Sequence, residues 1–208
     1  MAADDYRNLG KSSRMKRFAV LLAAIVVATP ALAADWREIA APPDVARLER
    51  FTESWTQARR EAEGGDAAEV AVADGLMNAA TVPDGPPITG NWKCRIIKVG
   101  GISPIVVYGW FNCRISMVDG ELFFEKLTGS QRLRGHMYAD ANAFVLLASG
   151  YVAGEDPGVY GGRGDHLGSD LAPTNQVAVV NRLADGRLRM GFPFPALEST
   201  FDIIELKR

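Results

Sequence analysis

The sequence predicts a mainly β protein, an eight-stranded antiparallel up-and-down barrel, with a β-sandwich as the alternative. From Gly90 onward the pattern is almost entirely strand and turn, and Asp119-Gly120 and Asp185-Gly186 are turns of the type that joins hairpin strands. Several strands in short succession, with no helical period between them, are typical of such folds. Eight is the number at which a barrel closes around side chains or one small ligand. The predicted strands are 91–99, 105–118, 121–128, 132–138, 143–152, 175–183, 187–192 and 201–207.

The chain begins with a leader whose residues 15–34 read MKRFAVLLAAIVVATPALAA. Lys16 and Arg17 form a positive n-region, an apolar run too short to span a bilayer follows, and residues 31–33 form an A-x-A cleavage site. This order favours a cleaved signal peptide over an uncleaved anchor. We therefore expect residues 1–33 to be leader and signal peptide, with Met15 as the true start, and a periplasmic protein that begins at Ala34 and has no membrane span.

The charge of the mature chain argues against nucleic acid as a partner. Removal of residues 1–33 leaves 18 basic and 23 acidic side chains, a net charge of −5. Binding to phosphates needs clustered Lys and Arg. The remaining residues suit one domain with a sizeable core.

Residues 34–87 are predicted to be an N-terminal helical segment that packs on the barrel domain, residues 88–208. The first helix opens at Pro42 and ends at Gly64-Gly65, and its apolar residues recur every three or four positions. A weaker, alanine-rich helix is expected over 66–80, interrupted by Gly75, and residues 83–87 form a proline-rich break before the first strand. The apolar stripe predicts a docking face for the rest of the protein.

The two cysteines, Cys94 and Cys113, predict one disulfide in an exported chain. A hairpin centred on the turn at 100–104 pairs residues whose numbers sum to 207, which sets the two cysteines directly opposite each other. The same register gives the second strand one unbroken apolar core face from Ile105 through Phe111 to Met117. Tyr108 and Trp110 then lie on the opposite face, where they either pack under the N-terminal helix, which the helix stripe favours, or form an exposed binding patch.

Two resemblances to known families follow from short motifs. Gly90-Asn91-Trp92, at the head of the first strand, resembles the G-x-W opening of the lipocalin and avidin superfamily. A longer set of motifs extends over nearly the whole mature chain: Asp35-Trp36, Cys94-Arg95, and residues 110–114, 126–132 and 201–206. With these motifs the chain resembles a domain-of-unknown-function family of exported proteobacterial proteins. That resemblance implies an exported single-domain protein and brings no activity and no site residues.

The first candidate ligand site is the run from Lys126 to Arg132. Its small polar residues suit a tight turn between two strands. Alternatively, Lys126, Ser130, Gln131 and Arg132 lie at the rim of a barrel mouth and present donors to a polar or anionic ligand.

The second candidate is the irregular, glycine-rich segment 154–174, which holds Asp165 and His166. Its carboxylates suggest calcium, but their spacing departs from the known calcium loop. Asp165-His166 could instead be half of an acid/base pair, but no nucleophile motif accompanies it. A solvated loop is the preferred interpretation, so we assign no catalytic residue, no metal and no cofactor. The predicted function is a non-catalytic envelope protein that binds a small molecule or a protein partner. The alternative is an envelope hydrolase with its site in 154–174.

Overall fold

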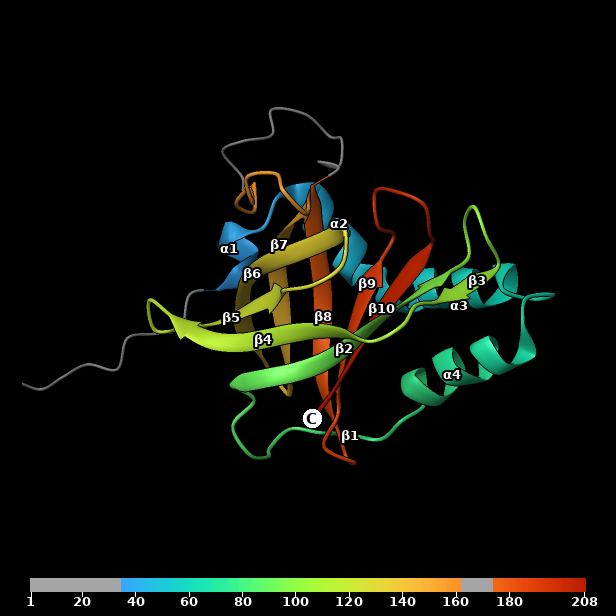
Figure 1. Cartoon of the computed structure of the whole chain (residues 1–208), viewed down its shortest axis with the longest axis horizontal. Helices are drawn as coiled ribbons and strands as arrows, with labels where there is room; N and C mark the ends of the chain where they lie inside the picture. Colours follow the sequence, from blue (N-terminus) through green and yellow to red (C-terminus); the bar gives the residue numbers. More distant parts are fainter. Residues whose placement is uncertain (1–34, 162–173) are drawn as a thin grey trace, which may run out of the picture. The chain divides into compact units, whose positions relative to one another are not determined.

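The computed structural model describes residues 35–161 and 174–208, and it confirms the predicted fold (Figure 1). Eight strands form a closed antiparallel barrel in which each strand pairs with the next along the chain, and the last pairs with the first. Seven barrel strands follow their predicted segments to within a few residues, whereas the single strand predicted over 105–118 is divided into strands at 105–107 and 111–118. The barrel strands are β2 (Gly90–Val99), β4 (Phe111–Val118), β5 (Glu121–Lys126), β6 (Gln131–Asp140), β7 (Ala143–Val152), β8 (Asn175–Leu183), β9 (Leu188–Pro193) and β10 (Phe201–Lys207). Two short strands lie beside them, β1 (Thr81–Val82) on β8 and β3 (Ile105–Val107) on β2.

The predicted hairpin register is wrong: the numbers of paired residues sum to 204 next to the turn and to 205 beyond a β-bulge, where 207 was expected throughout. Val99 lies opposite Ile105 at the start of the hairpin, whereas Trp92 lies opposite Cys113 further along it. Between the two stretches the chain has one extra residue at Gly109-Trp110, opposite Arg95. A slip of one residue turns every following side chain to the other face of a strand.

The bulge therefore divides the apolar face that the sequence predicts. Ile105 packs outside the barrel among residues of the helices, while Cys113 and Ile115 point inward to the barrel core. Met117, at the end of the same alternation, is 56% exposed. The disulfide itself is present: Cys94 and Cys113 are diagonal neighbours across β2 and β4, with 5.9 Å between their Cα atoms.

The helical segment forms four helices: α1 (Trp36–Ile39), α2 (Pro42–Glu49), α3 (Phe51–Glu61) and α4 (Ala67–Met77). The single helix predicted over residues 42–62 is divided at Arg50, whose φ of −92° and ψ of 20° lie outside the helical range. Apolar spacing alone did not reveal this break, because the stripe continues on both sides of it. Asp66 begins α4 as an N-cap and accepts hydrogen bonds from the amides of Ala68 and Glu69.

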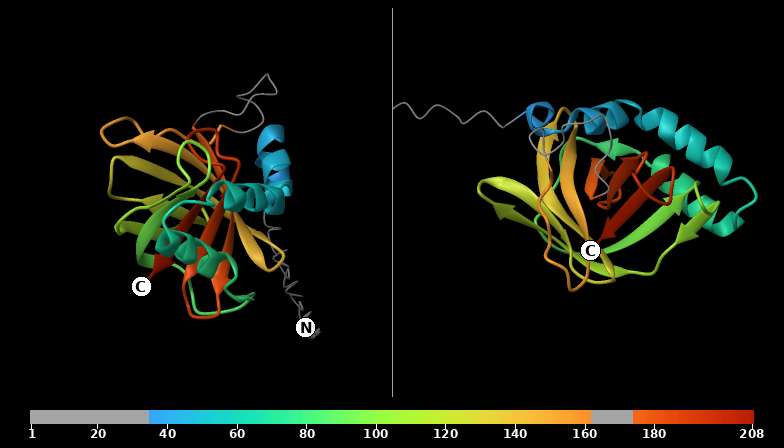
Figure 2. Two further views of the ribbon diagram at one scale, coloured as in Figure 1. Left: turned by 90° about the vertical axis from the view of Figure 1, so that its right-hand side faces the viewer. Right: turned by 90° about the horizontal axis from the view of Figure 1, so that it is seen from above.

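The helices cover the barrel's outer face in two places (Figure 2). α3 and α4 pack over β2, β9 and β10, where Phe201 meets Phe51 and Trp55 at ring-centroid distances of 5.1 and 5.5 Å. α1 and α2 pack over β7 and β8 in a separate apolar cluster that contains Trp36 and Leu48. The apolar stripe is thus buried against the barrel.

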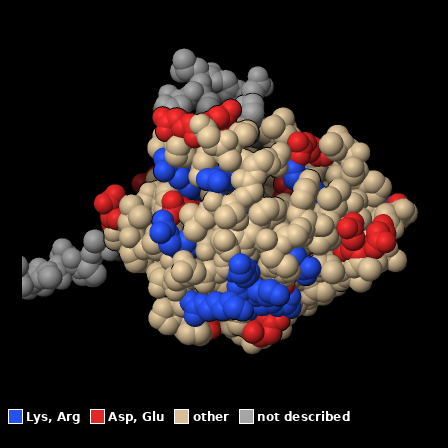
Figure 3. Space-filling view, in the orientation of Figure 1, with Lys and Arg blue, Asp and Glu red and all other residues tan. Residues whose placement is uncertain are grey.

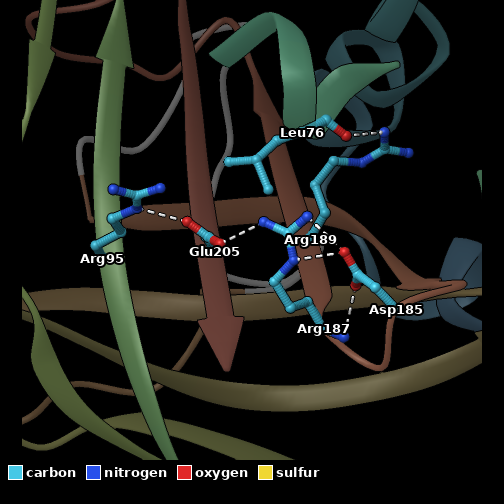
Figure 4. Close-up of polar contacts among 6 residues, drawn as sticks. All are labelled: Leu76, Arg95, Asp185, Arg187, Arg189 and Glu205. Carbon is cyan, nitrogen blue, oxygen red and sulfur yellow. Dashed lines mark hydrogen bonds and ion pairs between the residues drawn. The ribbon is translucent and has the colours of Figure 1, made fainter. Parts of the chain in front are cut away.

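Buried polar contacts anchor the helices as well. In α2, Asp44 is fully buried, forms an ion pair with Arg47, and accepts hydrogen bonds from Tyr160 and Asn175. Figure 4 shows the second anchor, in which Arg189 of β9 donates to the carbonyl oxygen of Leu76 near the end of α4. Arg47 in turn donates to the carbonyl oxygen of Asn175 in β8, so each guanidinium links a helix to a barrel strand.

Candidate functional site: the cavity at one end of the barrel

A cavity of about 400 Å³ opens at one end of the barrel, within the size range of small-molecule sites. It is bounded by the last residues of β5, β7 and β9, the first residues of β6, β8 and β10, and the segment 195–198. Deeper in the barrel the interior is filled by fully buried side chains such as Phe124 and Met190. Most of the cavity's depth is apolar, with a lining of Ile96, Phe111, Leu133, Phe192 and Ile204.

One of the inward positions of the cavity carries no side chain, which adds to its space. Gly150 of β7 lies directly opposite Leu133 of β6, and both line the cavity. A Cβ atom built on Gly150 would have Gln176 Cγ as its nearest neighbour, at 3.4 Å. A larger residue at this position would therefore extend into the space that the cavity now occupies.

The structure brings together the four residues that the sequence places at a barrel rim. Lys126, Ser130, Gln131 and Arg132 all line the cavity, where β5 turns into β6. Asp165 and His166 lie outside the described residues. Lys98, Glu198 and Asp202 also line the cavity, and sequence reasoning missed them because barrel closure brings β2 and β10 to β5 and β6.

Lys126 is the most buried charged residue of the cavity, at 4% exposure. Its Nζ donates hydrogen bonds to the carbonyl oxygens of Thr128 at 2.8 Å and Gln131 at 2.5 Å, and it lies 4.0 Å from the ring centroid of Phe111. Burial, with a smaller effect of nearby Arg132, lowers the pKa of Lys126 to about 8. Gly129, with φ at +93°, closes the turn over this group, since a Cβ there would lie 2.7 Å from Nζ.

The wall from β2, β10 and the segment before β10 carries one basic and two acidic side chains, Lys98, Glu198 and Asp202. Lys98 forms an ion pair with Glu198. Asp202 accepts a hydrogen bond from Ser199 Oγ at 2.5 Å, and burial raises the pKa of Asp202 to about 6. Glu155 follows β7 at the rim, is exposed, and accepts a hydrogen bond from the amide of Val152. The cavity thus has acidic groups in excess on one side and the basic groups Lys126 and Arg132 on the other.

Features expected of a hydrolytic or metal site do not gather at the cavity. No histidine or cysteine is among its described lining residues. His136 lies on β6 away from the cavity, beside Phe123 and 3.5 Å from Glu121. Across residues 35–161 and 174–208, no three His, Cys, Asp or Glu side chains come together as potential metal ligands.

Comparison with known protein families gives a match that extends over the helices and strands of the structure. The model of a family described as a domain of unknown function, DUF4893, matches residues 36–206, from α1 to the last barrel strand. The chain belongs to the DUF4893 family. No curated protein and no solved structure matches it. The predicted domain-of-unknown-function family is therefore confirmed, while the resemblance to the lipocalin and avidin superfamily stays a prediction.

The DUF4893 barrel also has a basic region on its outer surface. Figure 3 shows Lys and Arg side chains gathered where Figure 1 places β2 and the C-terminal end of the chain. Trp110, 39% exposed, is held here between the Arg95 guanidinium and the Lys207 ammonium, 4.8 and 4.0 Å from its ring. Of the two expectations for Trp110 and Tyr108, packing under the helices is wrong, since both side chains are exposed and Tyr108 lines the cavity.

Acidic groups compensate part of this basic region. The buried carboxylate of Glu205 binds Arg95 on one side and Arg187 on the other, and Arg187 also binds Asp185 (Figure 4). These contacts join β2, β10 and the turn before β9. Among the described residues, no helix is both long enough and apolar enough to cross a membrane.

Proposed function

We propose that this DUF4893 protein is an exported, non-catalytic protein that binds one small molecule in the cavity at the end of its barrel. The observation that carries the proposal is the cavity itself, open at one end, apolar in its depth and edged by a few polar groups. Binding sites for small molecules have this combination, because apolar walls supply affinity and a few polar groups fix orientation. The fold alone would not support a function, so the proposal depends on this site.

The lining indicates which kind of molecule fits. Ile96, Leu133 and Phe192 offer an apolar surface to the body of a ligand, and the polar side chains of Gln131 and Gln176 lie nearer the opening. A ligand with an apolar body and a polar end matches this order of groups. A protein partner would instead use the exposed outer surface around Trp110.

A neutral apolar dye tests the proposal directly. The fluorescence of N-phenyl-1-naphthylamine should rise in a saturable, one-to-one titration of the protein. Gly150→Leu should weaken this binding by about tenfold or more, because the new side chain would fill the cavity opposite Leu133. The same replacement on α4, Gly75→Leu, is the matched control, since a Cβ there meets no atom within 4 Å and Gly75 does not line the cavity.

Comparison of the wild-type protein with Gly150→Leu and Gly75→Leu shows whether the dye binds in the cavity or on the outer surface. Equal dye binding by all three would place the dye on the outer surface and contradict the proposal, as would no binding at all. Thermal melts of the variants should confirm that both replacements leave the barrel folded.

Export and the second candidate site belong to the proposal too. Expression from Met15 should give a periplasmic protein whose N-terminus is Ala34, and N-terminal sequencing that finds residues 18–27 intact in membranes would contradict this. If Asp165 and His166 bind the ligand, replacing both with alanine should weaken ligand binding. The thermal midpoint should change little, because substitutions in surface loops usually alter stability by within about 0.5 kcal/mol.

A further inference from the structure

We propose that the cavity takes an amphipathic molecule with an anionic end, and that Lys126 is the residue that binds the anionic group. This inference rests on the proposed function, because it assigns the chemistry of a ligand in the same cavity. The geometry that carries it is a nearly buried ammonium on the cavity wall, next to an apolar depth and with no carboxylate bound to it among the described residues.

The hydrogen bonds of Lys126 leave room for a ligand. An ammonium carries three N–H donors. Two of them reach the carbonyl oxygens of Thr128 and Gln131, and these neutral acceptors hold the group in place without compensating its charge. The face of the Phe111 ring adds only a weak attraction at 4.0 Å. One donor and one full positive charge therefore remain for a group in the cavity.

The arrangement of the other charges favours an anion on this wall. The charged side chains that line the same cavity are Lys98, Arg132, Glu155, Glu198 and Asp202. Glu198 is held by an ion pair with Lys98 and a hydrogen bond with the side chain of Gln131. Arg132 lies near Lys126 and donates to the carbonyl oxygen of Gly129 at 3.2 Å. Within residues 35–161 and 174–208, no ion pair joins a carboxylate to Lys126 or Arg132, and a ligand carboxylate would compensate these two adjoining basic groups.

The cost of burying the Lys126 ammonium explains why an anionic ligand should bind more tightly than a neutral one of the same length. Burial lowers the pKa of Lys126, so the charged form is costly in the empty cavity. A bound anion would stabilise that charged form by a charge-assisted hydrogen bond, which is stronger than a bond to a neutral group. An alcohol of the same length would fill the apolar part equally well without this gain.

The test compares decanoate with decan-1-ol by isothermal titration calorimetry at pH 7. In the wild-type protein, decanoate should bind about tenfold more tightly than decan-1-ol, the difference expected between a charged and a neutral hydrogen bond. Lys126→Met should abolish this preference and leave decan-1-ol binding nearly unchanged. Lys93→Met is the matched control, because Lys93 is exposed and donates to Asn112 on the outer surface, and the preference should persist in it.

A pH series on the wild-type protein tests the same point without a substitution, in case Lys126→Met disturbs the turn at 127–131. Decanoate stays ionised above pH 7, so its affinity should fall as the pH rises above about 8 and Lys126 loses its proton. The affinity for decan-1-ol should stay constant over the same range.

The outcomes separate the two proposals. Equal affinities for decanoate and decan-1-ol would refute the role of Lys126 and leave the cavity as a binding site. A preference for decanoate that survives Lys126→Met, or that does not vary with pH, would also overturn the assignment. Binding of neither compound, together with no dye binding, would refute the cavity as a site for amphipathic molecules.

Discussion

Phe201 packs between the barrel and the helices, and its replacement by alanine measures how much this packing contributes to the free energy of unfolding. The residue is fully buried in β10, and its ring meets Phe51 and Trp55 of α3 edge-on, at interplanar angles of 81° and 65°. Replacing a buried phenylalanine by alanine costs about 3 to 5 kcal/mol, because apolar area and packing are lost together. Each edge-on aromatic pair contributes about 0.5 to 1.5 kcal/mol beyond its buried area. We therefore expect Phe201→Ala to fall in the upper half of that range.

Urea denaturation followed by circular dichroism gives the required free energies of unfolding. Met117→Ala serves as the control, because Met117 is also an apolar residue on a barrel strand but is 56% exposed, and its loss should cost well under about 1.5 kcal/mol. A cost for Phe201→Ala as small as that of the control would refute the packing of α3 against β10.

Two further predictions concern Asp202 and the disulfide. Burial raises the pKa of Asp202 from 3.8 to about 6, so the folded protein keeps a proton that the unfolded chain releases in this window. The free energy of unfolding should therefore fall as the pH rises from about 4 to about 6, by at most about 3 kcal/mol relative to Asp202→Asn. Parallel pH profiles of the two proteins would contradict the buried position of this carboxyl. Titration of the unfolded, unreduced protein should find no free thiol at Cys94 or Cys113. Reduction should cost about 3 kcal/mol, and two reactive thiols would disprove the bridge.

The sequence predicted the strands well because their signals are local. Alternation of apolar and polar residues marks each strand, and the turns at Asp119-Gly120 and Asp185-Gly186 carry the residues that such turns need, with φ at +52° for Asp119 and +86° for Gly186. Gly109 was a weak local signal of the bulge, because glycine inside a strand often marks one, but the apolar alternation continues across it. The predicted register failed first at the turn, where the pairing differs by three residues from the expected one, and the bulge then changed it by one more residue.

The candidate site was predictable only in part, for a similar reason. Lys126, Ser130, Gln131 and Arg132 lie in one short run, so a turn at the rim of a barrel could be expected from the sequence. Lys98 and Asp202 reach the cavity through the pairing of β2 with β10, the first and last strands of the barrel. Gly150 adds to the space of the cavity, and a glycine inside a strand pattern is a local signal that could have indicated that space.

A two-dimensional ¹H–¹⁵N NMR titration with decanoate would locate a small amphipathic molecule bound inside the end of the barrel. Chemical shift changes should concentrate on amides of the cavity wall, at 130–133, 150–152, 174, 176 and 197–198, and should saturate together. Amides of α3 and α4 should be nearly unaffected. Changes confined to the helices or to the outer surface around Trp110, or no saturable change at all, would show that the cavity is not the binding site.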